Sequence, residues 1–140
     1  MSRQAEAEWK GDLKGGNGRV KLGSGVFEGN YSFSSRFENG PGANPEELVG
    51  AALAGCYSMA LANSLAQAGF PATSIHTVAD VHLGKDDKGF LVTRIDLTVE
   101  GTVPNLDNAT FQQQAEKTRT GCIMARALAA TPITAKATLT

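Results

Sequence analysis

Short runs in which apolar and polar residues alternate occupy the first forty positions of the chain. Residues 20–22 and 31–37 both show this alternation, which is typical of strands with one buried face. Residues 39–42 read Asn-Gly-Pro-Gly, a cluster of turn-forming residues. We therefore expect a strand-rich N-terminal region that ends in a turn near residue 40.

A long helix is predicted directly after this turn, over residues 45–68. Asn44 is a favourable N-cap and Pro45 suits the first helical position, while Gly69 followed by Phe-Pro is a typical helix stop. The helix has apolar or small residues on nearly every face, which favours a buried helix that other backbone can approach closely. The small residues are Gly50, Ala51, Ala52, Ala54, Gly55, Ala60, Ala62 and Ala66.

The rest of the chain alternates between strand and helix patterns. The expected elements are strands at 75–83 and 90–102 with a turn at 85–89, helices at 106–119 and 122–130, and a strand at 133–139. This order predicts an α+β fold with an antiparallel sheet. No linker or repeat divides residues 1–140, so we expect one domain. Burying both the helix and one sheet face is difficult in so short a chain, which points to a homodimer.

Charge and composition exclude several classes of partner. The net charge is −1 and the basic residues are scattered, so neither nucleic acid nor an anionic membrane is an expected partner. The N-terminus is too polar for a signal peptide, and no run reaches about 18 uninterrupted apolar residues. We expect a cytoplasmic protein, and there paired cysteines are more often catalytic, redox-active or metal-bound than structural.

The chain has two cysteines, Cys56 within the long helix and Cys122 after Gly121 at the start of a short one. A helical cysteine among small residues is often a buried apolar side chain, and a reactive one needs a nearby cation to favour its thiolate. Arg36 is a candidate cation. Glu46 lies ten residues before Cys56, about 15 Å along one helix, so it could hold Arg36 or reach the thiol of a two-fold partner.

Cys122 is expected to feel the backbone N–H groups of its helix start, which favour thiolate. A capping or packing role is the alternative for this residue. His76 and His82 share one strand face, but with the cysteines they lack zinc-site spacing. A cysteine–histidine hydrolase is equally weakly indicated, because no nucleophile motif surrounds Cys56.

Three blocks of sequence resemble the OsmC branch of the OsmC/Ohr hydroperoxide reductases. They are Ser-Arg-Phe-Glu at 35–38, Asn-Pro-Glu-Glu-Leu-Val-Gly-Ala-Ala at 44–52 and Ala-Gly-Cys-Tyr-Ser-Met-Ala at 54–60. The segments at 9–16, 77–81 and 121–122 follow in the order of that branch, so the resemblance covers essentially the whole chain. It implies an intertwined homodimer with antiparallel sheets wrapped around central helices and sites at the subunit interface.

The resemblance also implies roles for individual residues. Cys56 matches the peroxidatic cysteine, Cys122 the resolving cysteine, and Arg36 and Glu46 an arginine–glutamate pair that polarises the thiol, with Glu47 as second choice for the carboxylate. The implied reaction reduces organic hydroperoxides to alcohols and is recycled by an external dithiol, with no cofactor. Ile123 stands where the family often has proline.

Apolar residues around Cys56, with Tyr57, Met59 and Phe37 as examples, suit organic hydroperoxides better than hydrogen peroxide. Two alternatives stay open. The same fold could serve as a redox sensor or binding module that uses the disulfide between the two cysteines as a switch. A purely structural dimer is the other possibility, and it predicts thiols that are inert to peroxide.

Overall fold

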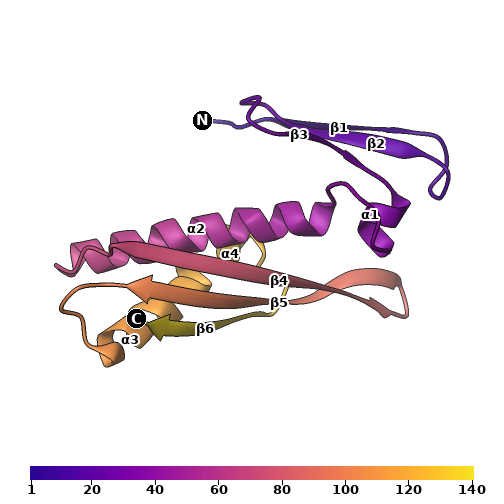
Figure 1. Cartoon of the computed structure of the whole chain (residues 1–140). Helices are drawn as coiled ribbons and strands as arrows, with labels where there is room; N and C mark the ends of the chain where they lie inside the picture. The colour runs from indigo at the N-terminus through magenta and orange to yellow at the C-terminus, as the bar shows by residue number, and fades with distance from the viewer. The chain divides into compact units, whose positions relative to one another are not determined.

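The computed structural model describes residues 1–140, which form two compact units, Met1–Leu48 and Val49–Thr140. The long helix α2 (Pro45–Gln67) begins in the first unit and continues into the second (Figure 1). Each unit has its own three-stranded sheet.

The first unit is built on an antiparallel sheet in the order β1-β2-β3. Its strands are β1 (Ala5–Lys10), β2 (Asn17–Leu22) and β3 (Glu28–Tyr31). The register places Gly18 between Trp9 and Tyr31, whose ring centroids are 5.3 Å apart. A side chain at Gly18 would clash with both rings, so this glycine allows the aromatic pair to form across the sheet.

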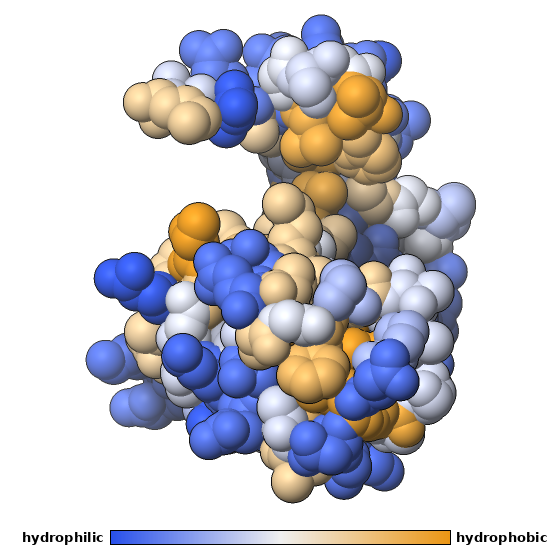
Figure 2. All heavy atoms as spheres, turned by 90° about the vertical axis from the view of Figure 1, so that its left-hand side faces the viewer, coloured by the Kyte–Doolittle hydropathy of each residue, from blue (hydrophilic) through white to orange (hydrophobic).

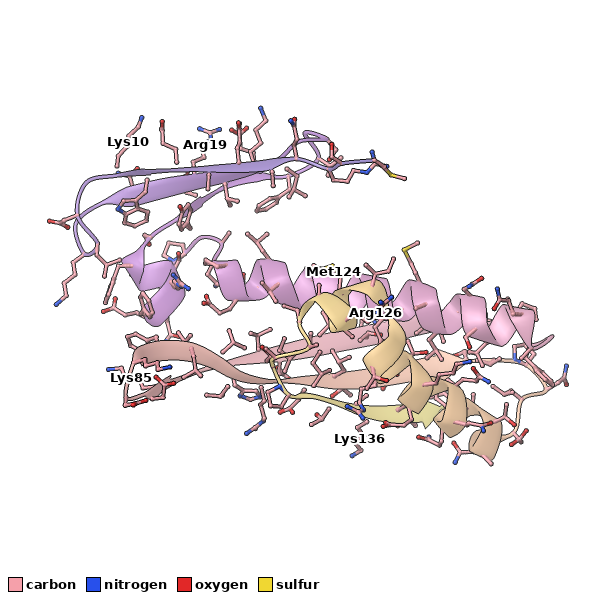
Figure 3. The ribbon with its side chains drawn as sticks, turned by 180° about the vertical axis from the view of Figure 1, so that it is seen from behind. Lys10, Arg19, Lys85, Met124, Arg126 and Lys136 are labelled. Atoms are coloured by element: carbon pink, nitrogen blue, oxygen red, sulfur yellow. The ribbon has the colours of Figure 1, made fainter.

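The two faces of this sheet differ in character. Lys10 and Arg19 point to the same side (Figure 3) and form exposed ion pairs with Glu8 and Glu28. The other face carries the aromatic pair and the aliphatic residues of β1 and β2. One side of this unit is accordingly apolar and the other hydrophilic in Figure 2. A sheet with one apolar face is stable only when another layer covers that face.

The predicted strand at 31–37 is wrong over most of its length. β3 ends at Tyr31, and the short helix α1 (Phe33–Phe37) follows. The reason is a capping box: the Ser32 hydroxyl accepts from the Ser35 N–H at 3.1 Å, and the Ser35 hydroxyl accepts from the Ser32 N–H at 2.9 Å. These reciprocal hydrogen bonds satisfy two helix-start donors that an alternating pattern does not reveal.

The second unit places helices against one face of the sheet β4-β5-β6. Its further elements are β4 (Ser74–Asp86), β5 (Gly89–Thr102), α3 (Asn108–Gly121), α4 (Ile123–Ala127) and β6 (Ile133–Leu139). The predicted hairpin is confirmed, with β4 and β5 antiparallel around a tight turn in which Gly89 has φ 123°. The positions of both helices and of β6 agree with the sequence to within a few residues.

The expectation of a fully antiparallel sheet is wrong for the last strand. β6 pairs with β5 in parallel, with Ile95 opposite Ile133. The cause is the connection: α3 and α4 carry the chain back along the sheet before β6 begins. A helical crossover of this length permits a parallel neighbour, whereas a tight hairpin does not.

The core of the second unit lies between α2, α3 and the inner face of β5. Alternate residues of β5 are buried in one cluster with a stripe of α2 and with Phe111 of α3; Figure 1 shows the long helix α2 running along this sheet. The fully buried side chains are Leu53, Tyr57, Leu61, Leu65, Ile95, Leu97, Val99 and Phe111. The spacing of four residues along α2 is that of one helix face. Because this face of α2 packs on the sheet, the residues on its opposite face are directed away from the sheet.

The termini of α2 follow the sequence prediction. The Asn44 side chain accepts from the Glu47 N–H at 2.8 Å, as an N-cap does. At the other end Gly69 has φ 92°, and the Phe70 N–H reaches the Leu65 carbonyl at 2.9 Å, a Schellman-type stop.

α2 is also unusually apolar. By length and composition alone it could cross a membrane, yet its stripe of large residues packs against the sheet as in a core helix. Only 28% of its most apolar stretch is buried within the single chain. The rest of this stretch is half-buried or exposed, and its exposed residues include Ala51, Gly55 and Met59.

Candidate active site

The two cysteines of the second unit meet at the first turn of α4. Cys56, half-buried on α2, accepts a hydrogen bond from the Met124 N–H at 3.4 Å. Cys122, buried at the junction of α3 and α4, accepts from the Ala125 N–H at 3.3 Å. Both are free thiols. The structure thus brings together two sulfurs that lie sixty-six residues apart in the sequence.

The environment of Cys122 acts on its pKa in opposite directions. Burial raises the pKa of the Cys122 thiol, and the adjacent Cys56 raises it further, while the N–H groups of Ala125 and Met124 lower it. The net direction is upward. The sequence correctly predicted that helix-start N–H groups would favour thiolate here, but burial outweighs them, so Cys122 is held as a neutral thiol.

Tyr57 lies in the core beside Cys56 and does not line an accessible surface. Its side chain is fully buried and its hydroxyl donates to the Ala115 carbonyl at 2.8 Å. Burial, with a smaller contribution from the Glu116 carboxylate, raises the pKa of Tyr57 to about 12. The expectation that Tyr57 contributes an apolar wall for substrate is therefore wrong, because its ring is enclosed. Met59, one turn beyond Cys56, is exposed instead.

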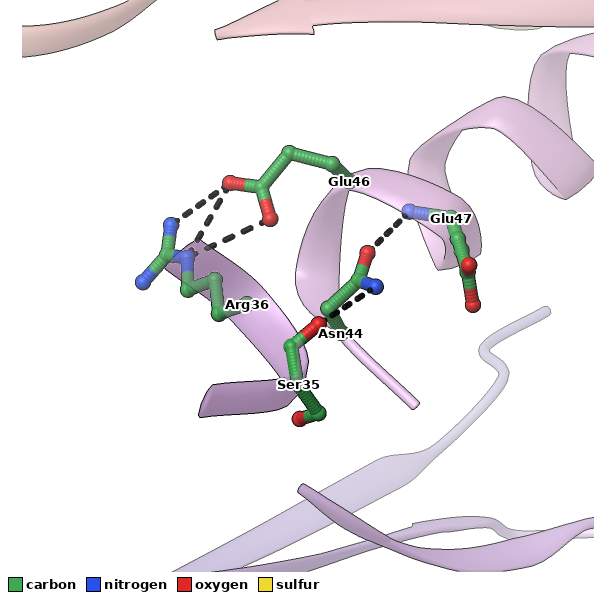
Figure 4. Close-up of polar contacts among 5 residues, drawn as sticks. All are labelled: Ser35, Arg36, Asn44, Glu46 and Glu47. Carbon is green, nitrogen blue, oxygen red and sulfur yellow. Dashed lines mark hydrogen bonds and ion pairs between the residues drawn. The ribbon is translucent and has the colours of Figure 1, made fainter. Parts of the chain in front are cut away.

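In the first unit, Arg36 and Glu46 form a fork-like ion pair (Figure 4). The Arg36 Nη2 donates to Glu46 Oε1 at 2.8 Å, and Nε donates to the two carboxylate oxygens at 3.1 and 3.2 Å. Such paired contacts fix the plane of the guanidinium. Arg36 thus lies on α1 rather than on the predicted strand, and its carboxylate partner is Glu46 and not the adjacent Glu47.

The loop between α1 and α2 holds this pair in place. The Asn44 amide donates to the Ser35 carbonyl at 3.2 Å while its oxygen caps α2 (Figure 4). The Ser35 hydroxyl donates to the Ala43 carbonyl at 2.7 Å. The end of α1 and the start of α2 are therefore tied together by two side chains, which sets Arg36 opposite Glu46.

Helix geometry separates Glu46 from the thiol on the same helix. The ten residues from Glu46 to Cys56 correspond to about 15 Å of rise along α2. A glutamate side chain cannot span that distance.

The histidines belong to the outer face of the second sheet and not to the thiol pair. His82 Nε2 lies 2.8 Å from Asp96 Oδ2, which also accepts from Arg94 at 2.9 Å. Thr134 donates to the other oxygen of Asp96, and these hydrogen bonds, that from Arg94 foremost, lower the pKa of Asp96 to about 2. No group of three or more potential metal ligands is present, so the weakly indicated zinc site does not form.

The family model described as OsmC-like protein matches residues 38–137. The chain is 47% identical over 131 residues to the proteins named Peroxiredoxin OsmC of Escherichia coli (strain K12) and of Shigella flexneri, covering 93% of this chain and 92% of each relative.

Solved structures share the fold at lower sequence identity. The organic hydroperoxide resistance protein OhrB of Bacillus subtilis superposes with a TM-score of 0.68 at 21% identity, covering 98% of both chains. An OsmC-like protein of unknown function from Vibrio cholerae gives a TM-score of 0.78 at 17% identity over 99% of both chains. The predicted α+β class is confirmed by these matches.

Proposed function

Because the chain belongs to the OsmC-like protein family, we propose that it is a thiol-dependent peroxidase that reduces organic hydroperoxides to alcohols. Cys56 is the peroxidatic cysteine and Cys122 the resolving one. The observation that carries this assignment is the meeting of the two sulfurs at consecutive backbone N–H groups of α4. A half-buried thiol beside a buried one is the arrangement that a two-cysteine cycle requires.

In the first step the Cys56 thiolate attacks the distal oxygen of the peroxide. The O–O bond breaks, the alkoxide takes a proton and leaves as alcohol, and Cys56 becomes a sulfenic acid. Arg36 stabilises the thiolate and the charge that develops on the peroxide, because guanidinium stays protonated and presents several donors in a plane. Glu46 holds that plane through the paired contacts described above.

In the second step the Cys122 sulfur attacks the sulfenic sulfur of Cys56. The S–S bond forms, and the hydroxide that leaves combines with the Cys122 proton as water. An external dithiol then reduces the disulfide by thiol–disulfide exchange and is itself oxidised to a disulfide. Over the cycle one hydroperoxide and one dithiol give one alcohol, one water and one oxidised dithiol, with no cofactor required.

We further propose that the working form is a homodimer with the site assembled between copies. Three features support this: the uncovered apolar surface of α2, the apolar face of the first unit's sheet, and the separation of Glu46 from Cys56 along one helix. The exposed stripe of α2 consists mostly of small residues, which allow close helix approach. Its members are Ala51, Ala52, Gly55, Met59, Asn63 and Ala66.

The substrate is proposed to be an organic rather than an inorganic peroxide. Met59, one turn after Cys56, and Ile123, next to Cys122, are exposed large apolar side chains. Apolar surface around a peroxidatic sulfur favours an alkyl or aryl substituent on the peroxide. We expect cumene hydroperoxide to be turned over with a higher kcat/KM than hydrogen peroxide, and equal values would contradict this choice.

The test of the cycle is mass spectrometry of both thiols before and after one equivalent of cumene hydroperoxide, followed by turnover with dithiothreitol. The wild-type protein should lose two hydrogens and gain a Cys56–Cys122 disulfide. Cys56→Ser should abolish peroxide consumption, whereas Cys122→Ser should consume about one peroxide per site and retain a sulfenic acid. Unimpaired turnover in Cys56→Ser would reject the assignment. A disulfide that forms once and is not recycled by dithiol would indicate a sensor instead.

The role of the ion pair has its own test. Arg36→Ala should shift the pH midpoint of Cys56 alkylation upward, because the proposed role of the Arg36 charge is to stabilise the thiolate. Arg19→Ala is a matched control, since Arg19 also belongs to the first unit and forms a surface pair with Glu28. If the two variants behave alike, Arg36 does not act on the thiol.

A further inference from the structure

The first turn of α4 directs its backbone donors at the two cysteines. The opening N–H groups of a helix have no partner within the helix. In α4, the Arg126 N–H donates to the Cys122 carbonyl at 3.0 Å and the Ala125 N–H to the Cys122 sulfur. The Met124 N–H donates to the Cys56 sulfur at 3.4 Å. Only the Met124 group leaves its own segment and reaches a residue on another helix.

We infer that the backbone N–H of Met124 is a positioning group for the peroxidase reaction, holding the Cys56 sulfur as a thiolate and in place beside Cys122. This inference rests on the proposed function and adds a residue to it. Met124 is not identified by any sequence motif, since every residue except proline carries a backbone N–H. Its side chain plays no part in the inferred role.

The geometry explains why this donor serves the resolving step as well. Met124 and Ala125 are consecutive residues, whose Cα atoms are separated by about 3.8 Å across one rigid peptide. The Met124 N–H donates to the Cys56 sulfur and also acts on Cys122, to whose sulfur the Ala125 N–H donates, so this peptide sets the separation of the sulfurs before peroxide arrives. A disulfide needs its Cα atoms within about 7 Å. Sulfurs that are already adjacent should therefore form the disulfide faster once Cys56 is oxidised to the sulfenic acid.

A hydrogen bond to a charged sulfur is also stronger than one to a neutral thiol. We therefore expect the Met124 N–H to bind the charged sulfur of Cys56 more strongly than the neutral thiol. The titratable groups around the sulfur pair are Tyr57, whose charge interacts with Cys122, and Glu116 and Arg119, which interact with Tyr57. All of these stay unchanged when only the Met124 N–H is altered.

The decisive variant replaces the amide at position 124 with an ester, by incorporating the α-hydroxy analogue of methionine. This change removes one N–H and keeps the side chain. Met124→Pro removes the same N–H by ordinary mutagenesis, and no helical hydrogen bond is lost because the position lies in the first turn. Ile123→Pro is the matched control, since the Ile123 N–H donates to neither sulfur.

The readout is the pH profile of Cys56 alkylation by iodoacetamide in the full-length protein, together with the rate of disulfide closure after one equivalent of cumene hydroperoxide. The ester and Met124→Pro variants should show a midpoint about one pH unit higher, equivalent to about tenfold less thiolate at neutral pH. Disulfide closure should slow in the same variants. Ile123→Pro should keep the wild-type midpoint.

A midpoint and closure rate equal to wild type in the ester variant would overturn the inference. That result is distinguishable from failure of the proposed function, because the wild-type protein would still turn over peroxide with dithiothreitol. If wild type itself formed no disulfide, the proposed function would fail first. A loss of thermal stability without a changed midpoint would show a purely structural role and would equally reject the inference.

Discussion

Replacing Gly55 with alanine gives opposite results for a monomer and for a dimer packed through α2. Gly55 lies in the interior of α2 on its exposed face, and a Cβ built there meets no atom within 4 Å of the single chain. In such a helix interior, alanine is more stable than glycine by about 0.5–1 kcal/mol. A monomer should therefore melt about 2–5 °C higher after Gly55→Ala.

A second copy of the chain reverses that sign. If two α2 helices cross at their small-residue stripes, each added methyl group at Gly55 enters a close contact. Overpacking of this kind costs about 1–3 kcal/mol per site, and two-fold symmetry applies the cost twice. The net effect of Gly55→Ala is then a loss of up to about 5 kcal/mol of dimer stability, and Gly55→Leu should dissociate the dimer.

Sedimentation equilibrium and thermal melts at two protein concentrations measure both quantities. Wild type should have twice the chain mass and a Tm that rises with concentration, as a linked association requires. Gly121→Ala is the control, because Gly121 is also helical and also faces open space but lies at the end of α3. A monomeric wild type, or a Gly55→Ala variant that melts higher at every concentration, would refute dimer packing through α2.

Three further predictions concern the residues around the thiols. Tyr57→Phe should lower the free energy of unfolding by about 1 kcal/mol at pH 7, because the hydrogen bond to Ala115 is lost. This difference in unfolding free energy shrinks at high pH. The pKa of Tyr57 is raised to about 12 from an ordinary value near 10, so the stabilisation linked to its protonated form is complete below about pH 10 and is lost as pH rises towards 12. Denaturant titrations should thus show the two proteins converging between pH 10 and 12, and parallel curves would contradict this. Ile123→Pro should stabilise by about 0.4–1 kcal/mol in the same titrations, because Cys122 before it has ψ 153°, a value that proline accepts, and a decrease would show strain. In Cys56→Ser, alkylation of Cys122 should have its midpoint above that of an unfolded control, because burial raises the Cys122 pKa; equal midpoints would show that the thiol is solvated.

Much of the fold could be predicted from signals that are local in the sequence. The caps of α2, its glycine stop and the β4–β5 hairpin all depend on residues within a few positions of one another, and each formed where it was predicted. The strand prediction for residues 31–37 was wrong because two local signals competed there. Alternation favoured a strand, while the Ser32–Ser35 capping box favoured a helix and prevailed.

The direction of β6 could not be read from its own residues. Its alternating pattern is the same for a parallel and an antiparallel neighbour, so only the path of the chain decides. α3 runs alongside the sheet and returns the chain to the middle of β5, where Ile133 pairs with Ile95 and the two strands then run on in the same direction. Orientation is thus a property of the whole crossover and not of the strand.

The thiol site shows the same division between local signals and packing. The sequence identified both cysteines, Arg36 and Glu46 as candidate site residues. The helix start at Cys122 also correctly predicted nearby N–H donors. The sequence does not reveal that burial overrides those donors and raises the Cys122 pKa, since burial arises from distant segments. A raised pKa suits the proposed resolving role of Cys122 better than the thiolate that the helix start predicted. A neutral Cys122 does not compete with Cys56 for peroxide, because thiolate is the nucleophile, and it keeps the proton that leaves with hydroxide as water when the disulfide closes.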